Sequence, residues 1–408
     1  MTLRDHARQI ISQTIQSVLP NNAVRKALEK IDLEAAHLYL VAIGKAAWPM
    51  ADMAANVLAD KLTKGILITK YDHIEGPIDK VEAYEAGHPI SDDNTYHATQ
   101  KVLDMVSDLG PDDLVIFLVS GGGSALFEKP AIESKLLEKI NADLLASGAN
   151  IKEINSIRKR LSKVKGGRFA QFVWPARIEA IVLSDVLGDR LDMIASGPAY
   201  PDSTTKEDVY EIIDKYDLDI DPRVKEFLDQ ETPKEIVNAN HHIIGSVREL
   251  VLRAKEEAEK LGYASLILTD HLDGLAKETG YMLANIARYY HNQGPLAIIA
   301  GGETVVEITG DGKGGRNQEI ALAAAEKIAG LDNVLVFSVG SDGTDGPTDA
   351  AGGMVDGQSK ERLENKGKSI DQVLQANDSY HALKDIDGLI MTGPTGTNVN
   401  DFCVVLIQ

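Results

Sequence analysis

Short apolar runs that alternate with helical segments constrain the fold of this 408-residue chain more than any other feature. Two of the clearest runs are LYLVAI at residues 38–43 and LVIFLV at residues 114–119. Apolar runs of this length are typical of buried strands, and the segments between them carry apolar residues at helical spacing. Strands that alternate with helices predict βαβ units around a largely parallel sheet that helices cover on both faces.

The alternation loosens between residues 200 and 239, where prolines interrupt short helices among many acidic residues. We therefore predict an α/β fold of two domains, with a boundary near residue 235 that divides the chain into residues 1–235 and 236–408. A strand at residues 242–245 is expected to open the second domain. Because ligands of parallel sheets bind beyond the carboxyl ends of the strands, polar segments at those ends are the candidate sites.

Composition and charge exclude several classes of protein. A hydrophobic fraction of 44% and a charged fraction of 25% are those of a soluble globular protein. No apolar run approaches the roughly 20 residues of a membrane helix, and the first residues do not resemble a signal peptide, so we expect a cytoplasmic protein. The net charge of −20 argues against nucleic acid or an anionic membrane as a partner. The single cysteine, Cys403, is expected in the core.

The glycine-rich stretch at residues 301–319 is the first candidate site. We expect a strand over residues 304–309, then a turn, then a helix that begins near Asn317. Arg316 stands where that helix begins, and a guanidinium beside unpaired N–H groups is a good place to hold a phosphate. The alternative is an arginine paired with a surface acid. Four glycines of the turn can take positive φ and let a ligand approach the backbone: Gly310, Gly312, Gly314 and Gly315.

Two more candidates follow strands in the first half of the chain. Lys45 lies at a strand-to-helix turn, IGKAAW, where a lysine can reach an anion above the helix start. The segment VSGGGSAL follows the strand at residues 114–119, and its glycines can curl their N–H groups around an oxyanion. The alternatives are a surface lysine and a plain flexible turn. The predicted binding residues of this segment are Ser120, Gly121, Gly122, Gly123 and Ser124.

A basic segment spans residues 155–170 of this acidic chain. On a helix, Arg158, Ser162 and Lys165 fall on one face and would bind an anion there. The alternative is a solvated helix that balances nearby acids.

Acidic and amide side chains supply the remaining candidates. Asp185 and Asp189 follow a predicted strand, and two such carboxylates can hold Mg²⁺ or accept a hydroxyl proton during phosphoryl transfer; helix capping is the alternative. Asp342 and Asp345 resemble part of a calcium loop with the wrong spacing, and we predict them as metal ligands. Asn398 lies in a segment of amides and hydroxyls suited to a sugar or a small hydroxy acid.

The chemistry that these segments share is the binding of anions, with carboxylates nearby for a cation. No constellation for a nucleophilic cysteine or a Ser-His-Asp triad is present in the sequence. This combination indicates phosphoryl transfer, in which positioning and charge neutralisation dominate. Two other hypotheses stay open: a hydroxy-acid reductase that uses the weak GxGxxG match at residues 310–315, and a sugar-acid binding protein without turnover.

Taken together, the segments resemble the ATP-dependent glycerate 2-kinases of the MOFRL family. The stretches that carry the resemblance are IGKAA, SGGGSAL, IRKRLSKVKGGR, SDVLGDRLDMIASGP, GGETVVEITGDGKGGRNQE, GSDGTDGPTDAAGG and GPTGTNVND, between residues 43 and 401. Arg160 stands where we expected histidine.

The resemblance implies a larger N-terminal Rossmann-like domain, a smaller C-terminal MOFRL-type domain and an active site in the cleft between them. It implies transfer of the ATP γ-phosphoryl group to the 2-hydroxyl of D-glycerate, with Mg²⁺ or another divalent cation, and leaves a homodimer open. Lys45 and Arg316 are regarded as central in such enzymes, and we expect Asp185 or Asp189 to activate the hydroxyl. The residues expected to bind substrate or ATP include Arg158, Lys165, Glu303, Asn317 and Asn398. A kinase for a related hydroxy acid remains an alternative.

Overall fold

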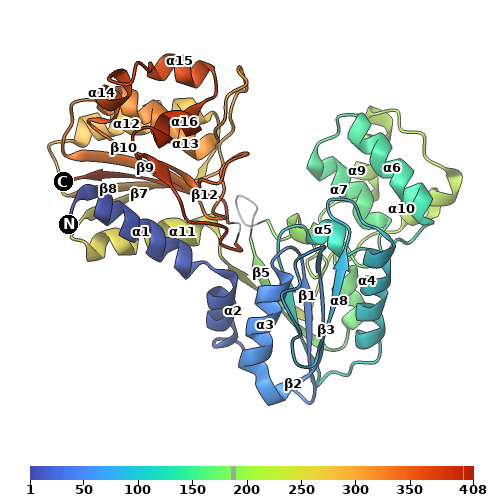
Figure 1. Cartoon of the computed structure of the whole chain (residues 1–408). Coiled ribbons are helices and arrows are strands. Elements are labelled where there is room, and N and C mark those ends of the chain that lie inside the picture. Colours follow the sequence, from blue (N-terminus) through green and yellow to red (C-terminus); the bar gives the residue numbers. More distant parts are fainter. Residues whose placement is uncertain (185–189, 398) are drawn as a thin grey trace. The chain divides into compact units, whose positions relative to one another are not determined.

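The computed structural model describes residues 1–184, 190–397 and 399–408. The chain divides into two compact units, which we call the N-terminal unit (residues 23–244) and the C-terminal unit (residues 1–22 and 245–408). Each unit is an α/β structure built on a six-stranded sheet (Figure 1). The predicted fold class of two α/β domains is therefore confirmed.

The sheet of the N-terminal unit is entirely parallel, with the strand order β3-β2-β1-β4-β5-β6 of a Rossmann-like fold. Its strands are β1 (Leu38–Ile43), β2 (Leu62–Lys70), β3 (Val81–Ala86), β4 (Leu114–Val119), β5 (Arg177–Leu183) and β6 (Ala239–Ile244). Strands β1 and β4 are buried almost throughout, as expected for central parallel strands that helices cover.

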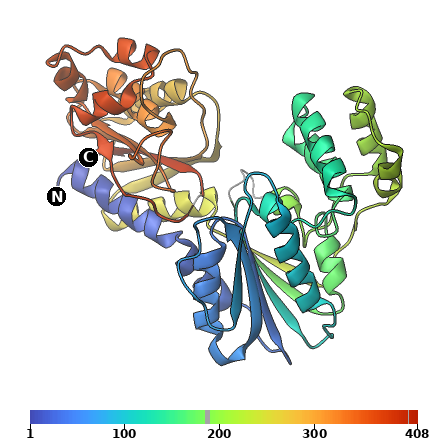
Figure 2. The same ribbon diagram turned by 45° about the vertical axis from the view of Figure 1, so that its right-hand side comes forward.

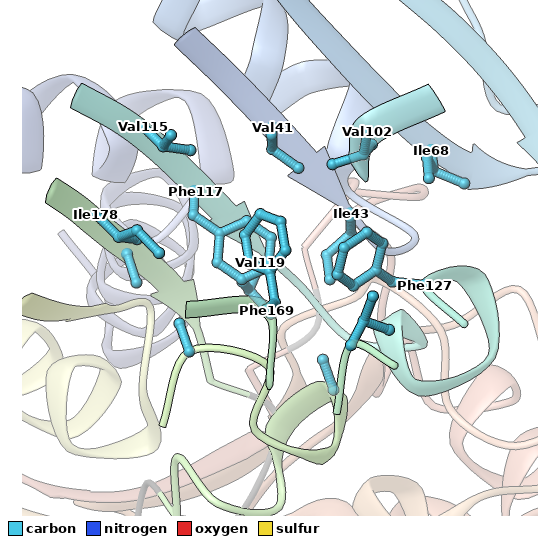
Figure 3. Close-up of a cluster of buried hydrophobic side chains, with 14 of the residues drawn as sticks. Val41, Ile43, Ile68, Val102, Val115, Phe117, Val119, Phe127, Phe169 and Ile178 are labelled. Atoms are coloured by element: carbon cyan, nitrogen blue, oxygen red, sulfur yellow. The ribbon is translucent and has the colours of Figure 1, made fainter. Parts of the chain in front are cut away.

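Helices enclose this sheet and form a second, helical core beside it. The helices are α2 (Pro20–Leu28), α3 (Ala47–Leu58), α4 (Asp93–Val106), α5 (Gly123–Leu126), α6 (Ser134–Ala146), α7 (Ile151–Arg160), α8 (Arg168–Val173), α9 (Lys206–Lys215) and α10 (Lys225–Asp229). In the main core, Phe117 of β4 packs against Phe127 and Phe169 with ring centroids 5.9 and 4.9 Å away (Figure 3). Helices α6, α7, α9 and α10 share their own apolar cluster, apart from the sheet (Figures 1 and 2).

The sheet of the C-terminal unit is mixed, with the order β11-β10-β9-β12-β8-β7. Its strands are β7 (Ala264–Leu272), β8 (Leu296–Gly302), β9 (Val334–Gly340), β10 (Gly352–Asp356), β11 (Leu389–Ile390) and β12 (Asp401–Ile407). Strands β7 and β8 are parallel, whereas β12 is antiparallel to both of its neighbours. The expectation of a largely parallel sheet is wrong for this unit, because the final strand inserts between β8 and β9.

Helices cover both faces of the mixed sheet. They are α1 (Leu3–Ser17), α11 (Val247–Lys260), α12 (Ala276–Tyr290), α13 (Arg316–Ile328), α14 (Ser359–Glu364), α15 (Ile370–Gln375) and α16 (Ser379–Lys384). Helices α12 and α13 lie on one face, and α1 and α11 lie on the other (Figures 1 and 2). Cys403 of β12 is buried in the core, as predicted. Among the described residues, no helix is both long and apolar enough to cross a membrane.

The division into units differs from the boundary predicted near residue 235. The strand expected at residues 242–245 to open the second domain is instead β6 (residues 239–244), which pairs with β5 in the N-terminal sheet. Helix α1 belongs to the C-terminal unit because its apolar face packs with α11 over that sheet. Its amphipathic pattern shows that one face is buried, but not which sheet lies beneath it.

Candidate functional site

The topological switch point of the N-terminal sheet lies between β1 and β4. From β1 the chain continues to β2 on one side, and from β4 it continues to β5 on the other. The carboxyl ends of two such strands leave a crevice in which ligands of open α/β sheets bind. Both central strands lead here into segments that the sequence analysis selected, at Lys45 and at Ser120–Ser124.

Hydrogen bonds tie these two segments together. The Lys45 N–H donates to the Gly121 carbonyl at 2.8 Å, and the Ala46 N–H donates to Ser120 Oγ at 3.1 Å. Ser120 Oγ in turn donates to the Ile43 carbonyl at 3.1 Å, and the side chain is buried. The Ser120 hydroxyl therefore holds the crevice in shape, and the expectation that it binds substrate does not fit this arrangement.

The glycine turn after β4 presents donors. Gly122 has a φ of 83°, a left-handed conformation that favours glycine. The N–H groups of Gly121 and Gly122 donate to none of the residues that the structure describes. Ser124 Oγ lies 2.9 Å from Ser196 Oγ. Two N–H groups without a partner among the described residues, beside an exposed lysine, can hold an oxyanion; that role, expected from the sequence, stays a prediction.

Three cationic or titratable side chains stand at the carboxyl ends of neighbouring strands. Lys45 follows β1, Lys70 ends β2 and His88 lies two residues after β3. Lys45 is exposed, and its ammonium pairs with no residue in the described part of the chain. Burial lowers the pKa of His88, and the charges of Lys45 and Lys70 lower it further. At this edge of the sheet, two lysines therefore lie near an imidazole whose neutral form is favoured.

A separate cavity of about 580 Å³ lies in the C-terminal unit, beside the first turn of α13. Arg316, Asp342 and Asp345 line it, together with the glycine-rich loop that precedes the helix. Arg316 binds Asp401 with two hydrogen bonds, from Nε at 2.6 Å and from Nη2 at 3.1 Å. Its Nη1 donates to Glu303 Oε1 at 2.6 Å. Two carboxylates therefore fix the orientation of the guanidinium in this cavity.

The two carboxylates differ in their surroundings. The Glu303 side chain is 44% exposed, whereas the Asp401 side chain is 10% exposed. Burial raises the pKa of Asp401 to about 6, against the lowering effect of the Arg316 guanidinium. Asp401 is thus the permanent partner of Arg316, and Glu303 is the partner that a ligand can replace.

Comparison with known proteins identifies the family. Residues 6–229 match a domain described as a domain of unknown function (DUF4147), and residues 296–401 match the MOFRL family. A D-glycerate 2-kinase from Thermotoga maritima is 49% identical, over 100% of this chain and 99% of the relative. The crystal structure of a glycerate kinase from Thermotoga maritima matches with a TM-score of 0.96, covers 100% of this chain and 99% of that one, and is 49% identical.

The chain belongs to the glycerate 2-kinase family with DUF4147 and MOFRL domains. A second relative, a putative hydroxypyruvate reductase from Agrobacterium vitis, is 39% identical over 90% of this chain and 98% of its own length. Both relatives thus resemble nearly the whole chain.

Within this family member, the predicted binding role of Lys165 does not fit the structure. Its ammonium lies 2.6 Å from Glu128 Oε2 and donates to the Phe127 carbonyl at 3.0 Å, and the side chain is 1% exposed. Lys159 is likewise buried and paired with Asp202 at 3.1 Å. The basic segment is therefore neither a solvated helix nor an open anion site. Arg158, which donates to Asn141, is half-buried and stays a prediction.

Asp345 and Asn317 have structural partners that the sequence analysis did not foresee. The Asp345 carboxylate accepts hydrogen bonds from the backbone N–H groups of Asn317 at 3.1 Å and Gln318 at 2.9 Å, and from both side-chain amides. It therefore caps α13 from a distant loop and occupies the N–H groups that we expected to hold phosphate. Asn317 is buried, and its amide oxygen accepts from Ser338. Neither the metal role of Asp345 nor the substrate role of Asn317 fits this geometry.

The glycine-rich loop also differs from its prediction. Residues 304–309 lie outside the sheet, apart from one bridge between Val305 and Leu275. None of its four glycines has positive φ. Instead, a Cβ at Gly310 or Gly312 would approach Ala376, and one at Gly315 would lie 2.3 Å from Cγ of Asp345. Glycine is needed here because the chain packs against itself, not because a ligand approaches.

Four predicted site residues remain. One of them lies on the cavity wall, and the other three lie outside the described residues. Asp342 lines the cavity, and its Oδ1 accepts the Thr344 N–H at 2.9 Å. Asp185, Asp189 and Asn398 fall on residues that the structure does not describe.

Sequence reasoning missed His88, Lys70 and Asp401. For Lys70 the signal was available, because it ends the apolar run of β2, whereas the strand before His88 reads VEAYEA and is not an apolar run. Asp401 opens the last strand, and only the sheet order brings it beside Arg316.

Proposed function

We propose that this chain is a D-glycerate 2-kinase, which transfers the γ-phosphoryl group of ATP to the 2-hydroxyl of D-glycerate and forms 2-phosphoglycerate and ADP. The observation that carries the proposal is the edge of the N-terminal sheet, where Lys45 meets two N–H groups that have no partner among the described residues, at the switch point. Phosphoryl transfer needs such fixed positive groups, because charge on the transferring oxygens must be neutralised.

In this reaction the 2-hydroxyl oxygen attacks the γ-phosphorus and forms the new O–P bond. The bond from that phosphorus to the β–γ bridging oxygen breaks, and ADP leaves. Lys45 neutralises charge on a phosphoryl or carboxylate oxygen, and the Gly121 and Gly122 N–H groups bind another such oxygen. The sequence predicted Asp185 or Asp189 as the acceptor of the hydroxyl proton; both lie outside the described residues, and a second candidate lies at the sheet edge itself.

Arg316 is the second proposed catalytic residue. Asp401 holds two of its nitrogens, so the guanidinium cannot swing freely. Its Nη1 faces the exposed Glu303, and an anionic substrate group can take the place of that carboxylate. A fixed fork presented in this way binds a planar or tetrahedral oxyanion with defined geometry.

A divalent cation such as Mg²⁺ belongs to the proposal because ATP phosphates are its usual ligands. Among the described residues, no group of three or more His, Cys, Asp or Glu side chains is arranged to hold a metal. That fits Mg²⁺, which takes one or two carboxylates together with waters and substrate phosphates. Asp342 would supply a carboxylate, since it lines the cavity with Arg316. The cation would neutralise charge on the phosphates when bound.

Replacement of Lys45 by alanine tests the proposal at the switch point. We expect kcat/KM to fall by at least on the order of 10²-fold, which corresponds to about 2.7 kcal/mol of transition-state stabilisation. Melting temperature should hardly change, because the side chain is exposed and pairs with none of the described residues. Lys64→Ala, at the opposite end of β2, is the matched control. Wild-type turnover in folded Lys45→Ala would make Lys45 an ordinary surface lysine.

The structure argues against the hydroxy-acid reductase hypothesis. Its basis was the GxGxxG match at residues 310–315. Gly310 and Gly312 of that match pack against residues 376–378 of the same chain, and Gly315 packs against Asp345. A dinucleotide-binding turn needs those glycines free for a pyrophosphate. NADH oxidation with hydroxypyruvate would revive this hypothesis, and binding of glycerate without ADP release would favour a binding protein. A cytoplasmic location and a homodimer also belong to the proposal.

A further inference from the structure

We propose that His88 is a catalytic residue whose imidazole accepts the proton of the glycerate 2-hydroxyl as the phosphoryl group is transferred. This inference deepens the proposed kinase function and rests on it. His88 lies just beyond β3, on the same sheet edge as Lys45, Lys70 and the glycine turn after β4.

The imidazole lies directly beside the proposed oxyanion cradle. A Cβ built on Gly122 would lie 3.0 Å from both Cδ2 and Nε2 of His88, and 3.2 Å from Cγ of Lys45. The ring and the lysine stem therefore flank the same residue of the glycine turn. A substrate oxygen held by the turn would be within reach of Nε2.

Both ring nitrogens of His88 are available, because neither hydrogen-bonds to a residue in the described ranges. The half-buried histidines of β6 differ in this respect. His241 Nε2 contacts the Ala199 carbonyl at 2.9 Å, and His242 Nε2 contacts Glu179 Oε2 at 2.6 Å. A half-buried imidazole without a partner among the described residues fits a group that bonds to substrate.

The charges around His88 keep it neutral in the free protein. Lys45 comes from the β1–α3 turn and Lys70 from the end of β2, and both lower the pKa of His88 in addition to burial. The nearby Asp92 carboxylate lies beside Gly87. It already accepts hydrogen bonds from the Tyr71 hydroxyl at 2.6 Å and from a backbone N–H in the first turn of α4. Binding of anionic substrates to the lysines would offset their charge and make the imidazole a stronger base at that moment.

The proton balance of the step is complete without another reactant. The hydroxyl oxygen forms its bond to the γ-phosphorus, the bond to the β–γ bridging oxygen breaks, and the hydroxyl proton moves to His88 Nε2. The imidazolium then returns the proton to solvent after product release. Neutral imidazole is the form that can accept the proton, so turnover should fall when the solution protonates it.

The test is the pH dependence of kcat with ATP and D-glycerate both saturating, for the wild type and His88→Gln. We expect the wild type to lose kcat on the acidic side of neutrality, and His88→Gln to lose about 10²-fold at pH 8 and to lack the acidic limb. The KM values for both substrates should stay within a few-fold. His37→Gln is the matched control, because His37 pairs with Asp113 at the opposite edge of the same sheet.

Other outcomes would overturn the inference. Wild-type kcat in His88→Gln would do so, as would a lowered kcat with an unchanged acidic limb, which indicates a structural effect. Loss of the limb in Asp189→Asn but not in His88→Gln would assign the proton to Asp189. Thermal melts of His88→Gln and His88→Asn establish that the compared variants are folded. If the wild type forms no ADP with D-glycerate, the kinase proposal fails, which is distinct from failure of the His88 role.

Discussion

Arg316→Ala should lose both stability and activity, the largest combined effect that we expect from one substitution. Removal of the guanidinium leaves the buried Asp401 carboxylate without its two hydrogen bonds. Breaking a buried ion pair in this way costs about 3–5 kcal/mol of unfolding free energy. Urea unfolding of wild type and variant at pH 8 measures the loss.

The stability deficit of Arg316→Ala should depend on pH with a definite sign. Burial already raises the pKa of Asp401 to about 6, above the roughly 3.9 of an unfolded aspartate. Ionisation of such a group costs stability, so the cost is absent at low pH and grows as the pH rises through the folded pKa. Arg316 lowers that pKa, and its removal moves the window upward. The deficit should therefore be smaller at pH 5 than at pH 8, and a pH-independent deficit would contradict the assignment to Asp401.

Arg316→Lys separates charge from geometry. Lysine keeps the positive charge but cannot form the paired hydrogen bonds that orient the guanidinium. At a temperature where both variants are folded, lysine should recover only part of the activity that alanine loses. The deficit should lie mainly in kcat rather than in the KM for ATP. Full rescue by lysine would show that a point charge suffices, and a pure KM effect would make Arg316 a ground-state binding residue.

Lys165→Met should destabilise the N-terminal unit by a similar amount, about 3–5 kcal/mol. The substitution leaves Glu128 buried without its cationic partner, which now lies 2.6 Å away. The double variant with Glu128→Gln should recover part of the loss, because it removes the unpaired charge. Lys163→Met is the matched control, since Lys163 is exposed two residues away. Equal melting temperatures for the Lys163 and Lys165 variants would show that the buried pair contributes nothing.

The central strands of the N-terminal sheet were predictable because buried parallel strands are continuous apolar runs. The edge strands β3 (VEAYEA) and β6 (ANHHII) are not such runs. Strands β1 and β4 coincide with the runs at residues 38–43 and 114–119. The order of strands in the C-terminal sheet was not predictable, because β12 enters between β8 and β9 from the far end of the chain. Local patterns carry no information about such non-local pairing.

Site prediction stays untested where a strand end and a glycine turn coincide, as at Gly121 and Gly122, whose N–H groups have no partner among the described residues. It failed where a charged residue has a distant buried partner. Lys165 pairs with Glu128, and Asp345 caps α13, through contacts that the sequence does not reveal. The type of a residue indicates which ligands its side chain can bind. Whether the side chain is free to bind one depends on its partners in the folded protein.

The position of the new phosphate ester tests the central claim most directly. Phosphorus NMR of the product from D-glycerate, ATP and Mg²⁺ distinguishes 2-phosphoglycerate from 3-phosphoglycerate. The same product, coupled to enolase and pyruvate kinase without phosphoglycerate mutase, should yield pyruvate. We predict 2-phosphoglycerate and mutase-independent pyruvate formation. A 3-phosphoglycerate signal, with pyruvate formed only after the mutase is added, would contradict the proposed reaction.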